Sequence, residues 1–249
     1  MSAVRKASHA GSWYSSNPDD LSASLSEWIQ EANSSPTPSV KPCRILILGP
    51  TAAHAYSRID PNAVDTVFVL GPSHKVYLDG CALTRCNEYE TPLGNLEINT
   101  DVVNELYSTG QFSWMSRATD ENEHSIEMHL PFIKLVMDQK ANGPYRIVPI
   151  LVGSISSAKH ALFGRILSPY FAKSNTLFVV SSDFCLDHEG MGLIEQLDVS
   201  GFNAYLSRTE NTVCGRHPFK SFCKLLLHFD MRFVHYAQSG KVTTPRRAV

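Results

Sequence analysis

The chain has 249 residues, 43% of them hydrophobic and 18% charged, and its 22 basic and 24 acidic residues give a formal net charge of -2. A chain of this length can bury one large core or two small ones, and we expect one α/β domain. The sequence has no long basic run, which argues against nucleic-acid binding. It also has no apolar segment of signal-peptide length, or of the roughly 20 residues that cross a bilayer. We therefore expect no membrane insertion and a cytoplasmic or nuclear location.

Predicted helices and strands alternate along the chain, which favours a mainly parallel sheet with flanking helices. Asn17 and Pro18 are typical of an N-cap and a first helical residue, and the helix that they start ends at a Ser/Pro-rich loop. Pro149 lies within one predicted strand and makes it the weakest of the strand predictions. Short apolar runs typical of buried strands cover residues 43–48, 66–70, 146–152 and 176–180. Further helices are predicted over residues 101–108, 160–171, 198–208 and 218–229, and a final strand over residues 232–237.

The stretch DENEHSIEMHLPF places acidic and imidazole side chains directly before an apolar segment. His124 and His129 are separated by about 140° on an ideal helix, so they do not face one metal ion. His124 and Glu127 can share a helix face and are candidates for an acid/base pair. Ser125 could equally cap a helix that bends at Pro131. The residues themselves leave both the pocket and the capping interpretation open.

Polar side chains follow two of the predicted strands, where ligands of open α/β sheets usually bind. The sequence GPSH follows residues 66–70 and brings Ser73 and His74 to the rim of the sheet. The sequence SSDFC follows residues 176–180 and offers Asp183 and Cys185 in the same way. The alternatives are a structural, hydrogen-bonded histidine and an ordinary polar turn.

A third candidate element is TVCGRHPF, in which Cys214 would lie just before the helix predicted from Pro218. A helix N-terminus lowers the pKa of a thiol and attracts anions. Arg216 could clamp a phosphate or a carboxylate there. A buried cysteine beside a turn glycine is the alternative. The chain's six cysteines form no Cys-x-x-Cys pair and are too sparse for a disulfide scaffold, so we predict free thiols.

Several of these motifs occur in the same order in one known family: SHAGSWY, LGPSH, DENEHSIEMHLPF, VPILVG, SSDFC, IEQLD, CGRHP and YAQS. Over nearly its whole length the chain resembles the Memo family, the eukaryotic mediators of receptor-tyrosine-kinase-driven cell motility. The resemblance implies a single α/β domain over residues 1–249, similar to class III extradiol dioxygenases, which use non-haem iron. It also implies a signalling or adaptor protein that binds phosphotyrosine-containing receptor peptides, reaches the microtubule cytoskeleton and binds iron or copper.

The resemblance also implies a set of site residues. The family's metal pocket matches His74 and Cys214, with Asp183 beside them, and the similarity places His124 and Glu127 at the border of this pocket. The remaining candidates for the pocket and for anion binding are His9, Ser73, Cys185, Arg216 and His217.

The chain departs from the family pattern at three places. A Pro-His-Ala-Gly-Tyr loop is missing near residues 48–52, a histidine is missing near residues 185–187, and the C-terminus diverges from about residue 240. We interpret these interruptions as skipped exons, hence a splice variant, or as a faulty gene model. Without the two family histidines, iron or copper should bind weakly, and a signalling role is favoured over a non-haem metal-dependent redox or dioxygenase-like enzyme. The lost sheet-covering helix also predicts lower stability and an exposed apolar patch near residues 178–184.

Overall fold

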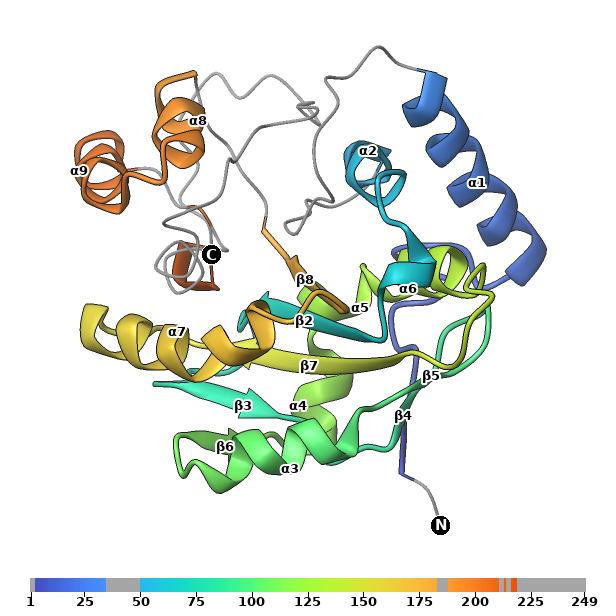
Figure 1. Ribbon diagram of the computed structural model, residues 1–249, viewed down its shortest axis with the longest axis horizontal. Coiled ribbons are helices and arrows are strands. Elements are labelled where there is room, and N and C mark those ends of the chain that lie inside the picture. The colour runs from blue at the N-terminus through green and yellow to red at the C-terminus, as the bar shows by residue number, and fades with distance from the viewer. Residues whose placement is uncertain (1–2, 35–49, 183–187, 211–212, 214–215, 219–249) are drawn as a thin grey trace.

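The computed structural model describes residues 3–34, 50–182, 188–210, 213 and 216–218. Its main sheet has five strands in the order β6-β3-β7-β2-β8 (Figure 1). These strands are β6 (Phe112–Trp114), β3 (Cys81–Leu83), β7 (Arg146–Val152), β2 (Thr66–Pro72) and β8 (Thr176–Val180). Strand β2 is parallel to both β7 and β8, whereas β3 is antiparallel to β7 and parallel to β6. The mixed α/β class with a mainly parallel sheet is thus confirmed.

The central strands form where the sequence has continuous runs of apolar, largely β-branched residues. All of β8 and all but the first residue of β2 and β7 are buried, as expected for parallel strands covered on both faces. Pro149 is tolerated in β7 because β3 pairs only with the three residues that follow it. The three predicted strands in this part of the chain are therefore confirmed. The predictions for residues 43–48, 218–229 and 232–237 fall outside the described residues, apart from residue 218.

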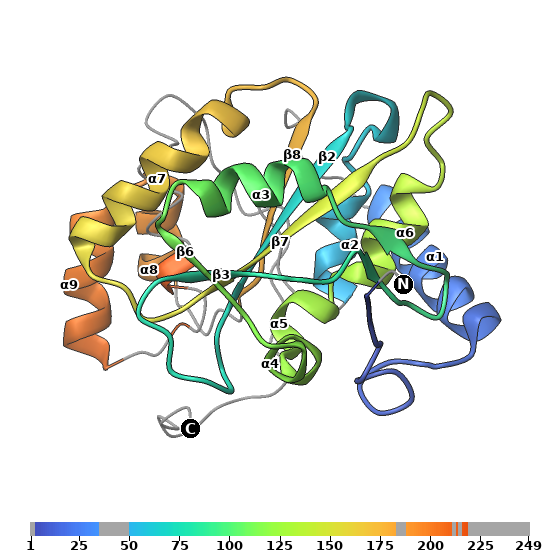
Figure 2. The same ribbon diagram turned by 90° about the horizontal axis from the view of Figure 1, so that it is seen from below.

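The helices follow the predicted capping signals. The described α-helices are α1 (Pro18–Ser34), α2 (Pro50–Tyr56), α3 (Thr100–Ser108), α4 (Arg117–Asn122), α5 (His124–Glu127), α6 (Leu130–Met137), α7 (Ser157–Phe171), α8 (His188–Glu195) and α9 (Val199–Thr209). Asn17 caps α1, because its side chain accepts two backbone hydrogen bonds of 2.9 and 3.1 Å. Helices α3, α7 and α9 confirm three further predicted helices. Figure 2 shows α3 and α7 along one side of the main sheet and α4 and α5 along the other. None of the described helices is both long and apolar enough to cross a membrane.

A second, three-stranded sheet fixes the N-terminal segment. Strand β1 (Val4–Arg5) pairs with β4 (Glu88–Tyr89), which pairs with β5 (Leu96–Glu97). Arg5 is fully buried, and its guanidinium donates hydrogen bonds to the carbonyl oxygens of Asp120 and Glu123. Because these carbonyls lie near the C-terminal end of α4, β1 holds the N-terminal segment beside the junction of α4 and α5.

The apolar patch expected near residues 178–184 is not exposed where the structure describes it. Phe178 is 0% exposed, and its ring stacks on Phe68 with the ring centroids 4.6 Å apart. The ring of Phe171 in α7 also packs on the Phe178 ring, with the centroids 5.4 Å apart. Ser181 and Ser182, which follow β8, are buried as well. The prediction is wrong for residues 178–182 because β2 and α7 cover β8. Residues 183 and 184 lie outside the described chain.

Candidate functional site

The candidate site forms where the end of β2 meets the short helix α5. The Ser125 hydroxyl donates a 2.9 Å hydrogen bond to the carbonyl oxygen of Pro72, the last residue of β2. Gly71 permits this approach, because a Cβ atom there would overlap the Ser125 Oγ and lie 2.7 Å from a side-chain carbon of Ile126. The contact brings His74, which follows β2, next to the residues that start α5.

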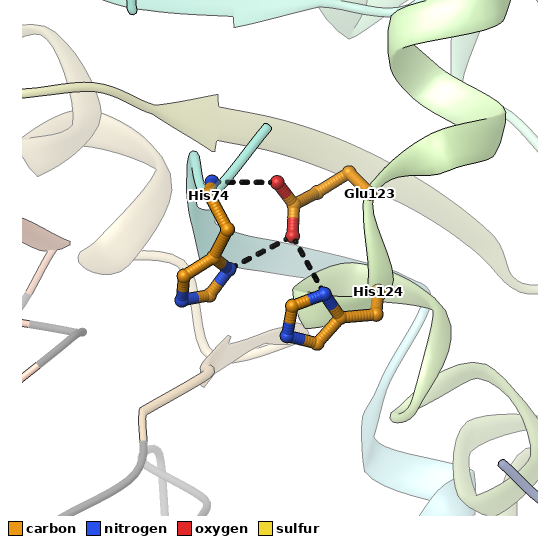
Figure 3. A group of neighbouring side chains, drawn as sticks. All are labelled: His74, Glu123 and His124. Carbon is orange, nitrogen blue, oxygen red and sulfur yellow. Dashed lines mark hydrogen bonds and ion pairs between the residues drawn. The ribbon is translucent and has the colours of Figure 1, made fainter. Parts of the chain in front are cut away.

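Glu123 organises this junction (Figure 3). Its Oε1 lies 3.0 Å from the His74 Nδ1 and 3.5 Å from the His124 Nδ1, and its Oε2 accepts a 2.8 Å hydrogen bond from the His74 backbone N–H. The Ser125 backbone N–H donates to the same Oε1 at 3.0 Å, so Glu123 is also the N-cap of α5. The two imidazole rings stack with centroids 4.5 Å apart and planes 19° apart. One buried carboxylate therefore holds His74 through hydrogen bonds and lies beside the His124 ring.

The orientation of the two rings defines what they can bind. In Figure 3, both Nδ1 atoms face Glu123, and both Nε2 atoms point away from it to the same side. Metal-binding histidines in proteins commonly use one ring nitrogen for the metal and the other for a carboxylate, as here. His74, Glu123 and His124 are close enough for their ligand atoms to surround one ion. Because both Glu123 oxygens already accept hydrogen bonds, the atoms best suited to a metal are the two Nε2 atoms.

Electrostatics agree with this division of roles. Burial alone would raise the pKa of Glu123, but hydrogen bonds from the His74 side chain and backbone and from the Ser125 N–H lower it to about 2. The carboxylate is thus ionised at neutral pH. Burial lowers the pKa of His124, which keeps its imidazole neutral, the form that binds metals. The His124 side chain is still 15% exposed and the His74 side chain 28% exposed, so ligands can reach both rings.

A second carboxylate holds a third histidine beside the first two. The fully buried Glu127 lies 2.8 Å from the His9 Nδ1 and also accepts hydrogen bonds from the His9 backbone N–H and the Tyr14 hydroxyl. Burial opposes ionisation of Glu127, but the ion pair with Arg5 and these hydrogen bonds lower its pKa. Glu127 therefore anchors the N-terminal segment, while its predicted acid/base role stays a prediction.

The three histidines and Trp13 form one continuous surface, which we call the imidazole cluster. Ring centroids are 4.6 Å apart for Trp13 and His124, 5.7 Å for His9 and Trp13, and 6.1 Å for His9 and His124. Trp13 is 55% exposed. The cluster consists of His9, Trp13, His74 and His124, with Glu123 and Glu127 behind its histidines.

The sequence missed Glu123 and suggested the wrong cap. Ser125 was considered as the cap of this helix, but α5 begins at His124 and Glu123 caps it. The helix expected to bend at Pro131 is instead two helices, since α5 ends at Glu127, α6 starts at Leu130, and Pro131 lies in the first turn of α6. His129 is separate from the cluster, as the spacing predicted: it is fully buried, and its Nδ1 lies 3.1 Å from the Tyr56 hydroxyl.

The structure places the other candidates in different ways. Ser73 shapes the turn after β2, because its hydroxyl donates a 2.7 Å hydrogen bond to the Val76 carbonyl. The Arg216 side chain donates a hydrogen bond to the Val213 carbonyl oxygen. The His217 Nδ1 lies 3.2 Å from the Nε2 of His160 in α7.

Three predicted site residues, Asp183, Cys185 and Cys214, lie outside the described residues. Of the six cysteines, the structure describes Cys81 and Cys86, which are free thiols as predicted.

Comparison with known proteins identifies the family. The chain matches a family model described as Memo-like protein over residues 5–249. It is 40% identical over 280 residues to "Protein memo-1 homolog" of Caenorhabditis elegans, with 96% of this chain and 78% of the relative covered. It is 40% identical over 279 residues to "Protein MEMO1" of Xenopus laevis, with 96% and 92% covered, and 39% identical over 276 residues to that of Homo sapiens, with 95% and 91% covered. Because these aligned stretches exceed the 249 residues of the chain, the relatives have residues within them that this chain lacks. The chain belongs to the Memo-like protein family.

Proposed function

We propose that this chain is a signalling or adaptor protein that binds phosphotyrosine-containing peptides of receptor tyrosine kinases or of their adaptors. In this role it promotes cell migration through the microtubule cytoskeleton. Family membership supports the proposal, and the observation that carries it is the imidazole cluster. An exposed indole and three imidazoles share one surface, and carboxylates lie behind the imidazoles.

The cluster offers chemistry suited to a phosphorylated aromatic side chain. The Trp13 ring presents an exposed aromatic face on which a tyrosine ring can pack. His9 and His74 each have Nδ1 beside a carboxylate, so a ligand would bind at their other ring nitrogen, Nε2. When protonated, each can donate its Nε2–H to a phosphoryl oxygen in a charge-assisted hydrogen bond.

Peptide binding tests this proposal directly. Fluorescence anisotropy would compare a phosphotyrosine peptide with its unphosphorylated twin on the purified chain. His74→Gln should weaken binding of the phosphopeptide about tenfold or more, since hydrogen bonds to charged groups contribute about 1.5–3 kcal/mol. Trp13→Leu should weaken it about two- to tenfold, since an aromatic pair contributes about 0.5–1.5 kcal/mol. Tyr77→Leu is a control, because Tyr77 is an exposed aromatic residue outside the cluster. Equal affinity for the two peptides would contradict the proposal.

We further propose that the same cluster binds iron or copper weakly, through the Nε2 atoms of His74 and His124. Two imidazoles are fewer than the four ligands of a structural zinc site, which is consistent with weak binding. Asp183 and Cys214 remain the additional ligands that the family pattern suggests. A bound metal would act as a Lewis acid that polarises an oxygen of the ligand. An anaerobic titration with iron or copper should lose its signal in a His74→Ala, His124→Ala double variant.

A metal-dependent redox or dioxygenase-like enzyme is the alternative function. It is favoured by the residue types at the site, because two histidines and one carboxylate are the ligand set of many non-haem iron oxygenases. The engagement of both Glu123 oxygens in hydrogen bonds disfavours it. Oxygen uptake by the iron-loaded protein with catechols separates the two functions: uptake that is lost in His124→Ala would support the enzyme.

The whole chain, residues 1–249, is proposed to form one domain from which the family's segments near residues 48–52 and 185–187 are absent. One family model spans residues 5–249, and the relatives have additional residues within the aligned stretch, which supports this proposal. Sequencing of transcripts across these two junctions tests it. Transcripts that always encode the longer loops would mean that the interruptions are errors of the gene model.

A further inference from the structure

A cavity of about 450 Å³ lies apart from the imidazole cluster, with none of the cluster's residues in its wall. Its lining residues are Ala3, Arg85, Cys86, Trp114, Met115, Ser116, Arg117 and Asp120. They come from the N-terminal segment, the connection between β3 and β4, and the passage from β6 into α4. Its volume falls in the range of about 300–1,000 Å³ that is typical of small-molecule sites.

The inner wall of the cavity is apolar. Cys86 and Met115 are 5% and 4% exposed, and Cys86 is a free thiol whose pKa is raised by burial. The Trp114 ring is half-buried and is held in place by stacking on Tyr107 at 4.2 Å. A flat aromatic or aliphatic group fits this environment better than a hydrated ion, because burial against these side chains removes apolar surface from water.

Two arginines stand at the opening of the cavity. The Arg85 guanidinium lies 5.6 Å from the centre of the Trp114 ring, and it has no ion-pair partner among the described residues. Arg117 uses its Nε for a 2.8 Å ion pair with Glu121, while its two terminal nitrogens make no hydrogen bond within the described part of the chain. A guanidinium group can donate two parallel hydrogen bonds to two oxygens of a carboxylate or a phosphate. Stacking on an aromatic ring orders the guanidinium group before a ligand binds.

The carboxylate in the wall does not cancel this charge. Asp120 lines the cavity, but its Oδ1 lies 3.1 Å from the Arg5 Nε and accepts a 2.6 Å hydrogen bond from the Tyr89 hydroxyl. Its Oδ2 accepts a 2.6 Å hydrogen bond from the Thr84 hydroxyl. Because Arg5, Tyr89 and Thr84 engage both Asp120 oxygens, the groups left for an anion on the open side are the Arg85 guanidinium and the terminal nitrogens of Arg117.

We infer that this cavity is a second ligand site, which binds a small aromatic anion, either an aryl phosphate or an aryl carboxylate. The aromatic body packs on Trp114 and Met115, and the anionic group pairs with Arg85 and Arg117. This site does not depend on the imidazole cluster or on its proposed function.

Tryptophan signals can report which site is occupied. The chain has three tryptophans, so 5-fluorotryptophan labelling gives three ¹⁹F signals, of which Trp114→Phe and Trp13→Phe identify two. Phenyl phosphate and benzoate, added separately to the full chain, should shift the Trp114 signal in a saturable way. Benzyl alcohol, which lacks the charge, and inorganic phosphate, which lacks the ring, should shift it much less. A shift of the Trp13 signal with an unchanged Trp114 signal would place the anion at the imidazole cluster and overturn the inference.

An arginine variant and its control complete the test. Arg85→Gln should weaken binding of phenyl phosphate about tenfold or more without loss of fold, because the side chain is exposed. Arg146→Gln is the matched control, since Arg146 is an exposed arginine at the start of β7 with Glu97 as its partner. Equal weakening in both variants, or binding of inorganic phosphate as tight as that of phenyl phosphate, would reduce the site to general surface charge. Comparison of the affinities for phenyl phosphate and benzoate then shows whether the site prefers a phosphate or a carboxylate.

Discussion

Replacement of Glu123 by glutamine tests the central feature of the candidate site. The side chain is 3% exposed and accepts hydrogen bonds from the His74 imidazole, the His74 backbone and the Ser125 backbone. Glutamine has the same shape, but its amide NH₂ group replaces one carboxylate oxygen. This group is itself a donor and cannot accept hydrogen bonds from the donors that face that oxygen. Glu123→Gln should therefore fold and yet be less stable than the parent chain.

The magnitude follows from the pKa of this carboxyl group. A fall in the pKa from 4.5 to about 2 corresponds to roughly 3 kcal/mol of stabilisation of the ionised form in the folded chain. Because the folded pKa lies below the unfolded one, this stabilisation is complete above about pH 5 and is lost as the pH falls towards 2. At pH 3 less than half of it, roughly 1 kcal/mol, should remain.

Urea unfolding at pH values from 7 to 3 measures this effect. The difference in unfolding free energy between the parent chain and Glu123→Gln should be near 3 kcal/mol at neutral pH and should shrink below pH 4.5. Glu121→Gln is a matched control, because Glu121 lies on α4 and pairs with Arg117 at the surface, where ion pairs contribute about 0–1 kcal/mol. A difference that stays constant from pH 7 to pH 3 would refute the reasoning, since it would show that the charge of Glu123 is not what stabilises the junction.

Four further substitutions, of which Gly192→Ala is a control, are tested by urea unfolding. Gly71→Ala should cost about 1–3 kcal/mol because the new methyl group meets the buried Ser125, whereas Gly192→Ala, in a helix with open space around it, should stabilise by up to about 1 kcal/mol. Arg5→Met should cost about 3–5 kcal/mol because two buried carboxylates lose their cation, and a loss below about 1 kcal/mol would contradict the assignment of a buried ion pair. Burial lowers the pKa of His129 from 6.5 to about 3, so the parent chain should lose about 1.4 kcal/mol per pH unit between pH 6 and 4 as the unfolded state takes up a proton. A His129→Leu variant should lack this part of the slope, and identical slopes would show that His129 is not its source.

The sequence predicted those parts of the fold that depend on local signals. Continuous apolar runs predicted the three central strands, because parallel strands buried on both faces need no alternation of polar and apolar residues. Asn17 predicted the start of α1, because a capping side chain acts within its own turn. The short strands β3 to β6 were not predicted. With two or three residues each, they have no periodic pattern of their own. They form by pairing with other strands, β3 with β7 and β6, and β4 with β1 and β5.

The site was harder to predict because its geometry depends on contacts between distant segments. His74 was recognised from its place after a strand, yet its partner Glu123 lies 49 residues further along the chain. His9 and Glu127 are 118 residues apart, and they meet because β1 pairs with β4 and Arg5 bonds to residues of α4 and α5. The exposed apolar patch near residues 178–184 was predicted wrongly for residues 178–182, because β2 and α7 cover β8 whether or not a further helix is present.

The stretch DENEHSIEMHLPF was open to a capping and a pocket interpretation, and Glu123 serves both roles with one carboxylate. Glu123→Asp can separate them. Aspartate is a preferred N-cap, so the bond to the Ser125 N–H should survive, but its side chain is one methylene shorter and should not reach the His74 ring as well. We expect stability closer to the parent than that of Glu123→Gln. We also expect metal affinity to fall about 10–100-fold, as when other partners that orient metal-binding histidines are removed. Anaerobic titration with iron or copper, together with urea unfolding, measures both effects, and unchanged metal affinity would mean that Glu123 caps the helix without orienting the histidines.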